Sequence, residues 1–182
     1  MVVATITCNY ENTPFYYPKK PPINLRDNTF KGAGGCCIWT KIDKKIHVLL
    51  GKERTNEWCF AMGKREAGES LVDTAVRETE EEMHVKVTDI KTSPWCIYMQ
   101  KDGQVLKNVI LIYFVELPSY IPASEFQKRI PLDNKYLSMN DYKWVPLDAI
   151  LDGSAYDGLK VRRCAKTIFM IAKKRGIFNR LK

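Results

Sequence analysis

Residues 63–85, GKREAGESLVDTAVRETEEEMHV, concentrate acidic side chains in a chain whose formal net charge is +8. Ser70 is a typical N-cap residue and Asp73 completes an imperfect capping box, so we predict a helix from about Ser70 to Met83. At about 100° per residue, the apolar side chains of this helix share one broad arc. The arc that we predict to be buried contains Leu71, Val72, Ala75, Val76, Thr79 and Met83.

Three glutamates lie on a narrow strip beside that arc. Glu78, Glu81 and Glu82 have the spacing i, i+3 and i+4, whereas Glu80 points elsewhere, toward solvent. Like charges at this spacing destabilise a helix by roughly 0.2–0.5 kcal/mol per pair, and a bound cation relieves the repulsion. Arg77, four positions before Glu81, can hold that carboxylate in a fixed fork. Oxygen ligands without His or Cys favour Mg²⁺ or Mn²⁺ over zinc. The spacing alone leaves a solvated acidic helix face as an equal alternative.

The composition indicates a globular protein with a polyanionic partner. The 182 residues suit a single domain, and 45% of them are hydrophobic. Six cysteines without a CxxC pair are typical of reduced thiols, so we expect a reducing, cytoplasmic compartment. We find neither a secretion signal nor an apolar run long enough for a membrane span, and therefore expect no membrane partner. The pI near 9.1 favours a nucleic acid or a polyphosphate as the partner.

The order of the predicted elements favours an α/β fold with a sheet that helices cover on both faces. Residues 1–29 form an N-terminal extension with a Pro-rich, basic segment. Gly63 lies in a loop before the acidic helix, residues 117–140 form a long loop, and a final helix runs from about Asp157 to Arg175. The buried face of that helix contains Val161, Cys164, Ala165, Ile168, Phe169 and Ala172. Strands are predicted within GAGGCCIWTK, KIHVLLGKER, EWCF, HVKVTDI, WCIYMQ, QVLKNVILIYFVEL and YKWVPL.

The acidic stretch resembles the Nudix box: Gly, five residues, Glu, seven residues, Arg-Glu, an apolar residue, any residue, Glu-Glu, any residue, Gly, and an apolar residue. The matching positions here are Gly63, Glu69, Arg77, Glu78, Thr79, Glu81, Glu82, His84 and Val85. Every charged position matches, while Thr79 replaces an aliphatic residue and His84 replaces Gly. Such a Gly commonly has φ > 0, which His tolerates at modest cost; a ligand-facing His84 is the alternative. The resemblance spans roughly residues 30–175 and indicates a Nudix hydrolase domain at 30–182.

The resemblance implies a three-layer α/β/α sandwich with a mixed sheet, and hydrolysis of a diphosphate linked to another group. It implies that Glu78, Glu81 and Glu82 bind Mg²⁺ or Mn²⁺, helped by the Gly63 carbonyl. Glu69 would stabilise the loop and helix, through Arg77, which supports catalysis. Glu81 would act as the general base, and Glu125 in the long loop is the alternative base.

Three substrate classes remain open. An mRNA-decapping enzyme fits the basic chain best; a hydrolase of diphosphoinositol or dinucleoside polyphosphates is next, and an ADP-ribose or nucleoside-triphosphate hydrolase needs the charge least. A non-catalytic RNA-binding module of the same fold is the alternative of another class. The candidate substrate contacts are Lys52, Arg54, Lys64, Arg162 and Arg163, and the last helix adds Lys166, Lys173 and Lys174 to its basic side. The aromatic residues that could stack a base, although core positions suit them better, are Trp39, Trp58, Trp95, Tyr98 and Trp144.

Overall fold

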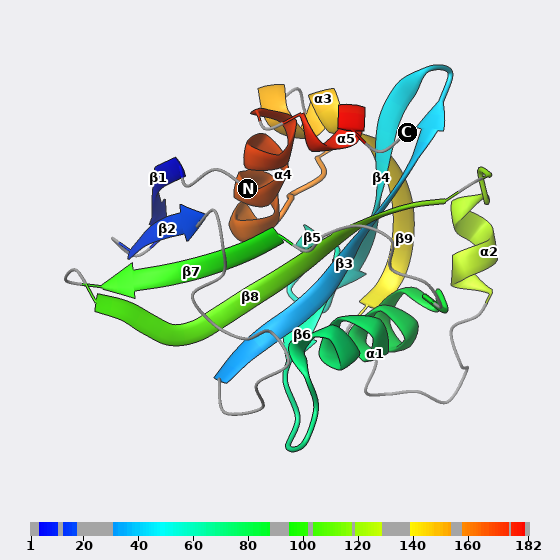
Figure 1. Cartoon of the computed structure of the whole chain (residues 1–182). Coiled ribbons are helices and arrows are strands. Elements are labelled where there is room, and N and C mark those ends of the chain that lie inside the picture. The colour runs from blue at the N-terminus through cyan, green and yellow to red at the C-terminus, as the bar shows by residue number, and fades with distance from the viewer. Residues whose placement is uncertain are drawn as a thin grey trace.

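The structure is a computed structural model of the whole chain (Figure 1). It describes the backbone of residues 4–10, 13–17, 31–87, 95–101, 104–117, 119–128, 139–153, 158–174 and 176–180, and the side chains of 32–87, 110–117, 119–128, 139–153, 158–174 and 176–178. The strands are β1 (Ala4–Tyr10), β2 (Thr13–Tyr17), β3 (Lys31–Ile42), β4 (Lys45–Glu53), β5 (Trp58–Cys59), β6 (Ala61–Lys64), β7 (Trp95–Lys101), β8 (Gln104–Glu116) and β9 (Met139–Pro146). The helices are α1 (Leu71–Met83), α2 (Ala123–Gln127), α3 (Leu147–Asp152), α4 (Arg163–Lys174) and α5 (Ile177–Arg180).

The strands form one mixed sheet. Its order is β1-β2-β7-β8-β3-β4-β5, with β6 paired to β3 and β9 paired to β4. The β3–β8 pair is parallel, and the other strand pairs of the described chain are antiparallel. Strands β1 and β2 extend the sheet beyond β7, so part of the N-terminal extension joins the sheet. The division of the chain at residue 30 stays a prediction.

Helices cover both faces of this sheet (Figure 1). Side chains alternate between the two faces along a strand, and β3 shows this directly. The Cys36 thiol lies on the side of α1, 3.7 Å from the Ala75 carbonyl oxygen. Trp39 lies on the other side, where its ring meets Phe178 of α5 at 5.6 Å between centroids. The predicted α/β/α sandwich is therefore confirmed.

Glycines on β3 let α1 lie directly on the strand. A Cβ atom on Gly34 would stand 2.5 Å from the Leu71 carbonyl oxygen and 2.7 Å from the Ala75 nitrogen. On Gly35 it would stand 2.1 Å from the carbonyl oxygen of Ala61 in β6. These distances are shorter than any van der Waals contact, so α1, β3 and β6 can come this close only because these two positions carry no side chain.

Three of the predicted loops and strands differ from the structure. Gly63 lies within strand β6, opposite Gly34, rather than in a loop. Helix α2 interrupts the predicted loop 117–140, of which residues 129–138 lie outside the described chain. Residues 84–87, predicted as the start of a strand, have no regular secondary structure.

The final helix begins later than its apolar spacing predicts. The Trp58 amide donates to the Lys160 carbonyl and the Arg162 amide donates to the Trp58 carbonyl, both at 2.9 Å, so this segment runs beside β5. Helix α4 starts only at Arg163. Val161 matches the helical spacing by coincidence, because its backbone bridges to Trp58.

The thiols behave as core groups. Cys36, Cys37 and Cys59 are buried, Cys164 is half-buried, and all four are free. Burial raises the pKa of Cys36 to about 11, which keeps it protonated. The side chains of Cys8 and Cys96 lie outside the described part. Within the part that is described, no helix is both long and apolar enough to cross a membrane.

We predict that Gly34→Ala lowers the free energy of unfolding by about 1–3 kcal/mol, because the added methyl group must push α1 away from β3. Urea unfolding measures this change. Lys41→Ala, which removes an exposed side chain from the same strand, is the control and should stay within about 0.5 kcal/mol. Equal stability of Gly34→Ala and the wild type would contradict the close packing of α1.

Candidate metal centre on helix α1

Both ends of α1 are fixed by local contacts. Ser70 Oγ accepts from the Asp73 amide at 3.1 Å, and Asp73 Oδ2 accepts from the Ser70 amide at 3.2 Å, which completes the capping box. At the other end His84 has φ 54°, the left-handed conformation predicted from the box, and its amide donates to the Glu80 carbonyl at 3.1 Å. Local sequence therefore sets where α1 begins and ends, and the helical spacing sets the angular positions of the glutamates relative to one another.

The three glutamates of the strip differ strongly in exposure. Glu78 is buried, with 9% of its surface exposed, while Glu82 is half-buried and the Glu81 side chain is 58% exposed. Burial raises the pKa of Glu78, although Arg77 opposes this shift. Glu80 is exposed, as predicted. A carboxylate that is both buried and ionised needs a nearby positive charge.

The predicted buried arc of α1 is correct in part. Leu71, Ala75, Thr79 and Met83 are buried, but so are Thr74 and Glu78, whereas Val72 and Val76 are only half-buried. Thr74 fits because its hydroxyl group, a single donor, has two acceptors within reach, the Ser70 carbonyl oxygen at 2.9 Å and Glu69 Oε2 at 3.0 Å. The helix is therefore rotated so that the Glu78 side of the strip, rather than the valines, faces the protein.

Arg77 joins the carboxylates. Its guanidinium grips Glu69 in a two-pronged contact, Nε to Oε1 at 2.7 Å and Nη2 to Oε2 at 3.1 Å. Nη1 also donates to Glu78 Oε1 at 2.8 Å and to Glu81 Oε2 at 2.9 Å. Nη2 reaches the Lys64 carbonyl at 3.0 Å. One side chain thus ties α1 to the loop before it and to β6.

Glu69 is the partner that the resemblance implies for Arg77, and the structure brings the two together. It also accepts from the Glu66 amide at 3.1 Å. The hydrogen bond from Arg77 is the main reason why the pKa of Glu69 is lowered to about 2. Because this pKa is lowered, the stabilisation that the pair gives is complete above the usual Glu pKa, near 4.3, and is lost only as the pH falls toward 2.

Strand β6 reaches the same carboxylates through its backbone. The Met62 amide donates to Glu82 Oε2 at 3.0 Å. A Cβ atom on Gly63 would stand 2.0 Å from the Glu78 carboxylate, so Gly at this position allows that carboxylate to lie against the strand. Sequence reasoning missed Met62, because a backbone contact leaves no trace in residue type.

The chemistry of these residues fits a hard divalent cation. All side-chain donors are carboxylate oxygens, and buried Glu78 lies against the backbone at Gly63, the residue whose carbonyl is the fourth predicted ligand. Within the described chain, no three His, Cys, Asp or Glu side chains already converge on one metal position. Arg77 holds Glu78 and Glu81, and Met62 holds Glu82. Glu81, the most exposed of the three, is the side chain most free to turn toward a cation.

Glu125, the alternative base, lies on α2 rather than in a loop. Its carboxylate pairs with Lys128 at 2.6 Å, and it is not among the partners of Arg77. The adjacent Phe126 packs against Tyr142 and Trp144 of β9. The structure therefore places Glu125 on a neighbouring element, and its role stays a prediction.

Of the predicted substrate contacts, Lys64 is the one that lies in the Arg77 network, through its carbonyl, and its side chain is exposed. Arg54 is exposed in the turn after β4. Lys52 pairs with Trp58 across β4 and β5, and neighbouring Gly51 pairs with Tyr142, whose hydroxyl group reaches α1. Since successive side chains alternate, Lys52 lies on the face opposite α1.

The basic residues of α4 lie in the other helix layer (Figure 1). Arg163 is exposed at the start of α4. Arg162 precedes the helix and pairs with Glu53 at 2.7 Å, so its charge already has an acidic partner, and its role as a substrate contact stays a prediction. Lys173 pairs with Asp148 of α3.

Most of the predicted stacking residues belong to the core. Trp39, Trp58 and Trp144 are at most 8% exposed. The side chains of Trp95 and Tyr98 lie outside the described part. Within that part, Tyr120 is the large aromatic residue with substantial exposure, 51%, and it lies next to Trp144 at 6.2 Å between rings. A single Tyr in a loop gives no sequence signal for such a position.

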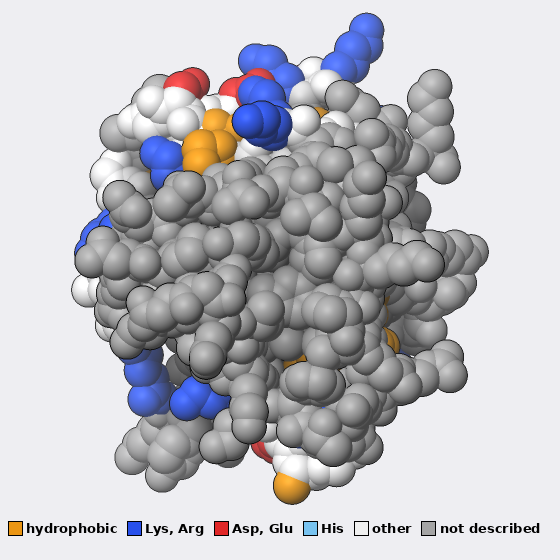
Figure 2. Space-filling model, turned by 60° about the vertical axis from the view of Figure 1, so that its left-hand side comes forward, with side chains coloured by type: hydrophobic (Ala, Val, Ile, Leu, Met, Phe, Trp, Pro, Cys, Tyr) orange, Lys and Arg blue, Asp and Glu red, His pale blue; other side chains and the backbone are white. Residues whose placement is uncertain are grey.

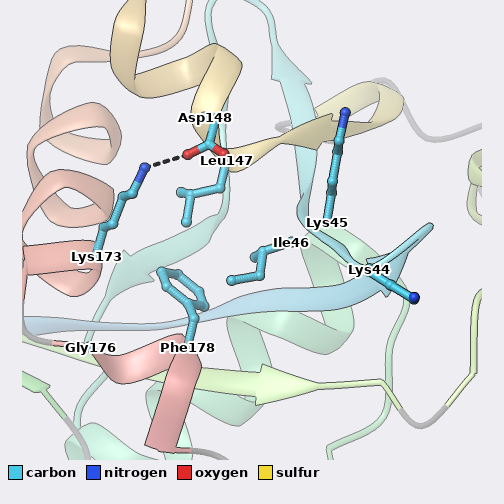
Figure 3. A pocket seen from close by; sticks show the side chains of 8 residues that line it. All are labelled: Lys44, Lys45, Ile46, Leu147, Asp148, Lys173, Gly176 and Phe178. Atoms are coloured by element: carbon cyan, nitrogen blue, oxygen red, sulfur yellow. Dashed lines mark hydrogen bonds and ion pairs between the residues drawn. The ribbon is translucent and has the colours of Figure 1, made fainter.

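One pocket lies between the β3–β4 turn and helices α3 to α5 (Figure 3). Its volume is about 250 Å³, and its lining residues are Lys44, Lys45, Ile46, Leu147, Asp148, Lys173, Gly176 and Phe178. Figure 3 shows the apolar side chains pointing toward one another, while Lys44 and Lys45 point outward and Lys173 bonds Asp148. The pocket is thus an apolar hollow on the layer opposite α1, separate from the carboxylates.

The family follows from comparison with known sequences. The NUDIX domain model matches residues 32–163. The chain belongs to the Nudix family. The predicted diphosphate hydrolase is thereby confirmed as a class of enzyme, while its substrate is not. No curated protein matches the chain significantly.

Solved structures agree on the fold. The Bacillus subtilis pyrophosphohydrolase BsRppH superposes with a TM-score of 0.60 at 14% identity, with 98% of each chain covered. The NUDIX domain of Shewanella oneidensis NrtR, solved with ADP ribose, gives 0.54 at 18% identity and covers 86% of this chain and 94% of its own. The C. elegans Ap4A hydrolase superposes with a TM-score of 0.50 at 17% identity, and the match covers 83% of this chain and 99% of the hydrolase chain.

We predict that Arg77→Ala weakens Mn²⁺ binding by about 10-fold to 100-fold, because the carboxylates lose the group that holds them in place. Electron paramagnetic resonance of free Mn²⁺ measures this affinity without a substrate. Arg77→Lys keeps the charge but loses the fork, and should fall between Arg77→Ala and the wild type. Lys86→Ala, which removes an exposed cation beyond the helix end, is the control. An unchanged Mn²⁺ titration in Arg77→Ala would mean that Arg77 has no role in the site.

Proposed function

We propose that this Nudix hydrolase uses Mg²⁺ or Mn²⁺ to cleave a diphosphate linkage, and that its preferred substrate is the 5′ cap of RNA. The observation that carries the proposal is the Arg77 network, which gathers Glu69, Glu78 and Glu81 beside β6. A group of carboxylates organised in this way repels a diphosphate unless a cation lies between them. The site is therefore suited to a metal-bridged anion rather than to a free one.

Glu78, Glu81, Glu82 and the Gly63 carbonyl would hold the cation. When bound, it would neutralise charge on the diphosphate and lower the pKa of bound water from about 15.7 toward 7. Glu81 is the proposed general base, because its carboxylate is exposed and so can accept a proton from water at the surface of the site. Arg77 keeps that carboxylate oriented through Nη1.

The preference for capped RNA is supported by the excess of positive charge, +8 over the whole chain. Figure 2 shows Lys and Arg side chains at the top and on the left of this face, and fewer acidic side chains. Several lysines and arginines are neutralised by partners, among them Arg162 and Lys173. The exposed cations that support RNA binding are Lys64, Arg163 and Lys174.

Small polyphosphates are the second candidate class. The Ap4A hydrolase and the ADP-ribose-bound NUDIX domain share the fold with this chain, which makes dinucleoside polyphosphates and ADP-ribose reasonable test substrates. Exposed Tyr120 offers a stacking surface for a base in either class. Diphosphoinositol polyphosphates, which have no base, would not use it. Absence of hydrolysis products from every substrate, with products identified by chromatography, would favour a binding module instead.

We predict that Glu81→Gln or Glu82→Gln lowers turnover by about 100-fold or more while the fold is retained, because charge stabilisation at the diphosphate is lost. Steady-state turnover and circular dichroism measure the two effects. Glu80→Gln is a matched control: Glu80 directly precedes Glu81 in the same helix, but its side chain is exposed to solvent, and the turnover of this variant should equal that of the wild type. Wild-type turnover that persists in excess EDTA would contradict the metal requirement.

We predict that capped RNA of at least about ten nucleotides is a better substrate than a cap dinucleotide, and that this preference shrinks between about 50 and 200 mM salt. Replacing Arg163, Lys166 and Lys174 by Ala should raise KM for the RNA and reduce its salt slope by about one per lost phosphate contact. The control variant carries Arg163→Lys, Lys166→Arg and Lys174→Arg, which keep the positive charges. Equal use of both substrates, insensitive to salt and to these changes, would reject capped RNA and leave the small polyphosphates.

A further inference from the structure

Tyr142 of β9 contacts the last turn of α1. A helix leaves its final carbonyl groups without partners inside the helix, and a buried one needs a donor from elsewhere. The Tyr142 hydroxyl group donates to the Glu82 carbonyl oxygen at 2.6 Å. Tyr142 is only 3% exposed, so water does not readily replace this bond. The residue whose carbonyl is held in this way carries one of the proposed ligand carboxylates.

The ring of Tyr142 supports the residue that ends the helix. It meets the His84 ring edge-on, at 6.0 Å and 75° between planes, and Phe126 packs against it at 6.2 Å. His84 has φ 54°, a conformation that costs a residue with a side chain about 1–2 kcal/mol. Tyr142 therefore contacts both residues that flank Met83, one through its hydroxyl group and the other through its ring.

Tyr142 is itself held firmly in the sheet. It pairs with Gly51 in the β4–β9 ladder, and its neighbours Lys143 and Trp144 pair with Leu50 and Leu49. A Cβ atom on Gly51 would stand 2.0 Å from Met139 Sδ, so the missing side chain lets Met139 fill the space beside Tyr142. A side chain anchored in this ladder can define the position of the helix end relative to the sheet.

Glu82 is thus held at two points. Tyr142 binds its carbonyl from β9, and the Met62 amide binds its carboxylate from β6. We infer that Tyr142 is a positioning residue for the metal centre: through the Glu82 carbonyl and the His84 ring it fixes the last turn of α1, and with it the Glu81 and Glu82 carboxylates. This inference rests on the proposed metal centre.

The test separates positioning from stability. Tyr142→Phe keeps the ring contacts and removes the hydroxyl group alone. We expect Mn²⁺ binding, measured by electron paramagnetic resonance without substrate, to weaken by about 10-fold. The Mg²⁺ concentration for half-maximal turnover should rise by a similar factor, while turnover at saturating Mg²⁺ largely recovers. Recovery is expected because excess cation can pull a loosened carboxylate back into place.

Tyr113→Phe is the matched control. Tyr113 is also buried, 4% exposed, and belongs to the cluster that packs on Leu71 and Ala75 at the start of α1. Removal of the Tyr113 hydroxyl group should change the thermal stability of the protein but leave its Mn²⁺ affinity as in the wild type. If Tyr142→Phe proves too unstable to titrate, Mn²⁺ affinity is compared between His84→Gly and the double variant His84→Gly/Tyr142→Phe. Both variants are expected to be more stable, because Gly adopts the left-handed conformation at position 84 without strain.

The outcomes are distinct. If the wild type itself fails to bind Mn²⁺, the proposed metal centre is wrong. If the wild type binds Mn²⁺ and Tyr142→Phe binds it equally well, whatever its melting temperature, Tyr142 is structural and the inference is overturned. Weaker binding in Tyr142→Phe alone, with rescue of turnover at high Mg²⁺, supports the positioning role.

Discussion

The guanidinium group of Arg77 is the contact on which the candidate site depends. It bonds Glu69 from the loop, Glu78 and Glu81 from α1, and the Lys64 carbonyl from β6. These bonds raise the pKa of Arg77 further above its ordinary value, and the bond to Glu69 has the largest effect. The positive charge of Arg77 is therefore permanent. The five donors of the planar guanidinium group make five hydrogen bonds here, to three carboxylates and one carbonyl, whereas a lysine has only three donors. Without Arg77, the acidic strip would repel itself, and α1 would keep only the Met62–Glu82 hydrogen bond and the packing of Glu78 on Gly63 as contacts with β6.

This network is possible only because glycines, which have no side chain, lie where α1, β3 and β6 meet. Gly34 and Gly35 allow the helix and β6 to approach β3, and Gly63 leaves room for the Glu78 carboxylate. The two effects act together: close packing buries Glu78, burial raises its pKa, and Arg77 offsets that shift. The site is therefore a product of glycine placement as much as of its acidic residues.

The sequence predicts the features that depend on near neighbours. The helix begins within one residue of its predicted start, the capping box forms, and His84 adopts the left-handed conformation, because each signal lies within a few residues. The burial of Glu78 was not predicted, because it depends on how α1 lies on the sheet. The late start of α4 was missed since apolar spacing cannot distinguish a helix from an extended segment beside β5. Contacts between distant residues, such as Arg162 with Glu53, 109 positions apart, leave no local signal.

The same limit applies to substrate choice. A net charge of +8 says nothing about which cations are already paired, and the structure shows that Arg162 and Lys173 already have acidic partners. Among the predicted substrate contacts, Lys64 is the one whose backbone belongs to the Arg77 network. An RNA cap and a small polyphosphate would present the same kind of diphosphate to the carboxylates of α1, so these carboxylates do not distinguish between the two substrates. Discrimination between them must come from residues farther out, where a long RNA can make contacts that a dinucleotide cannot reach. For this reason the dependence on substrate length, rather than turnover of the diphosphate itself, carries the information about the natural substrate.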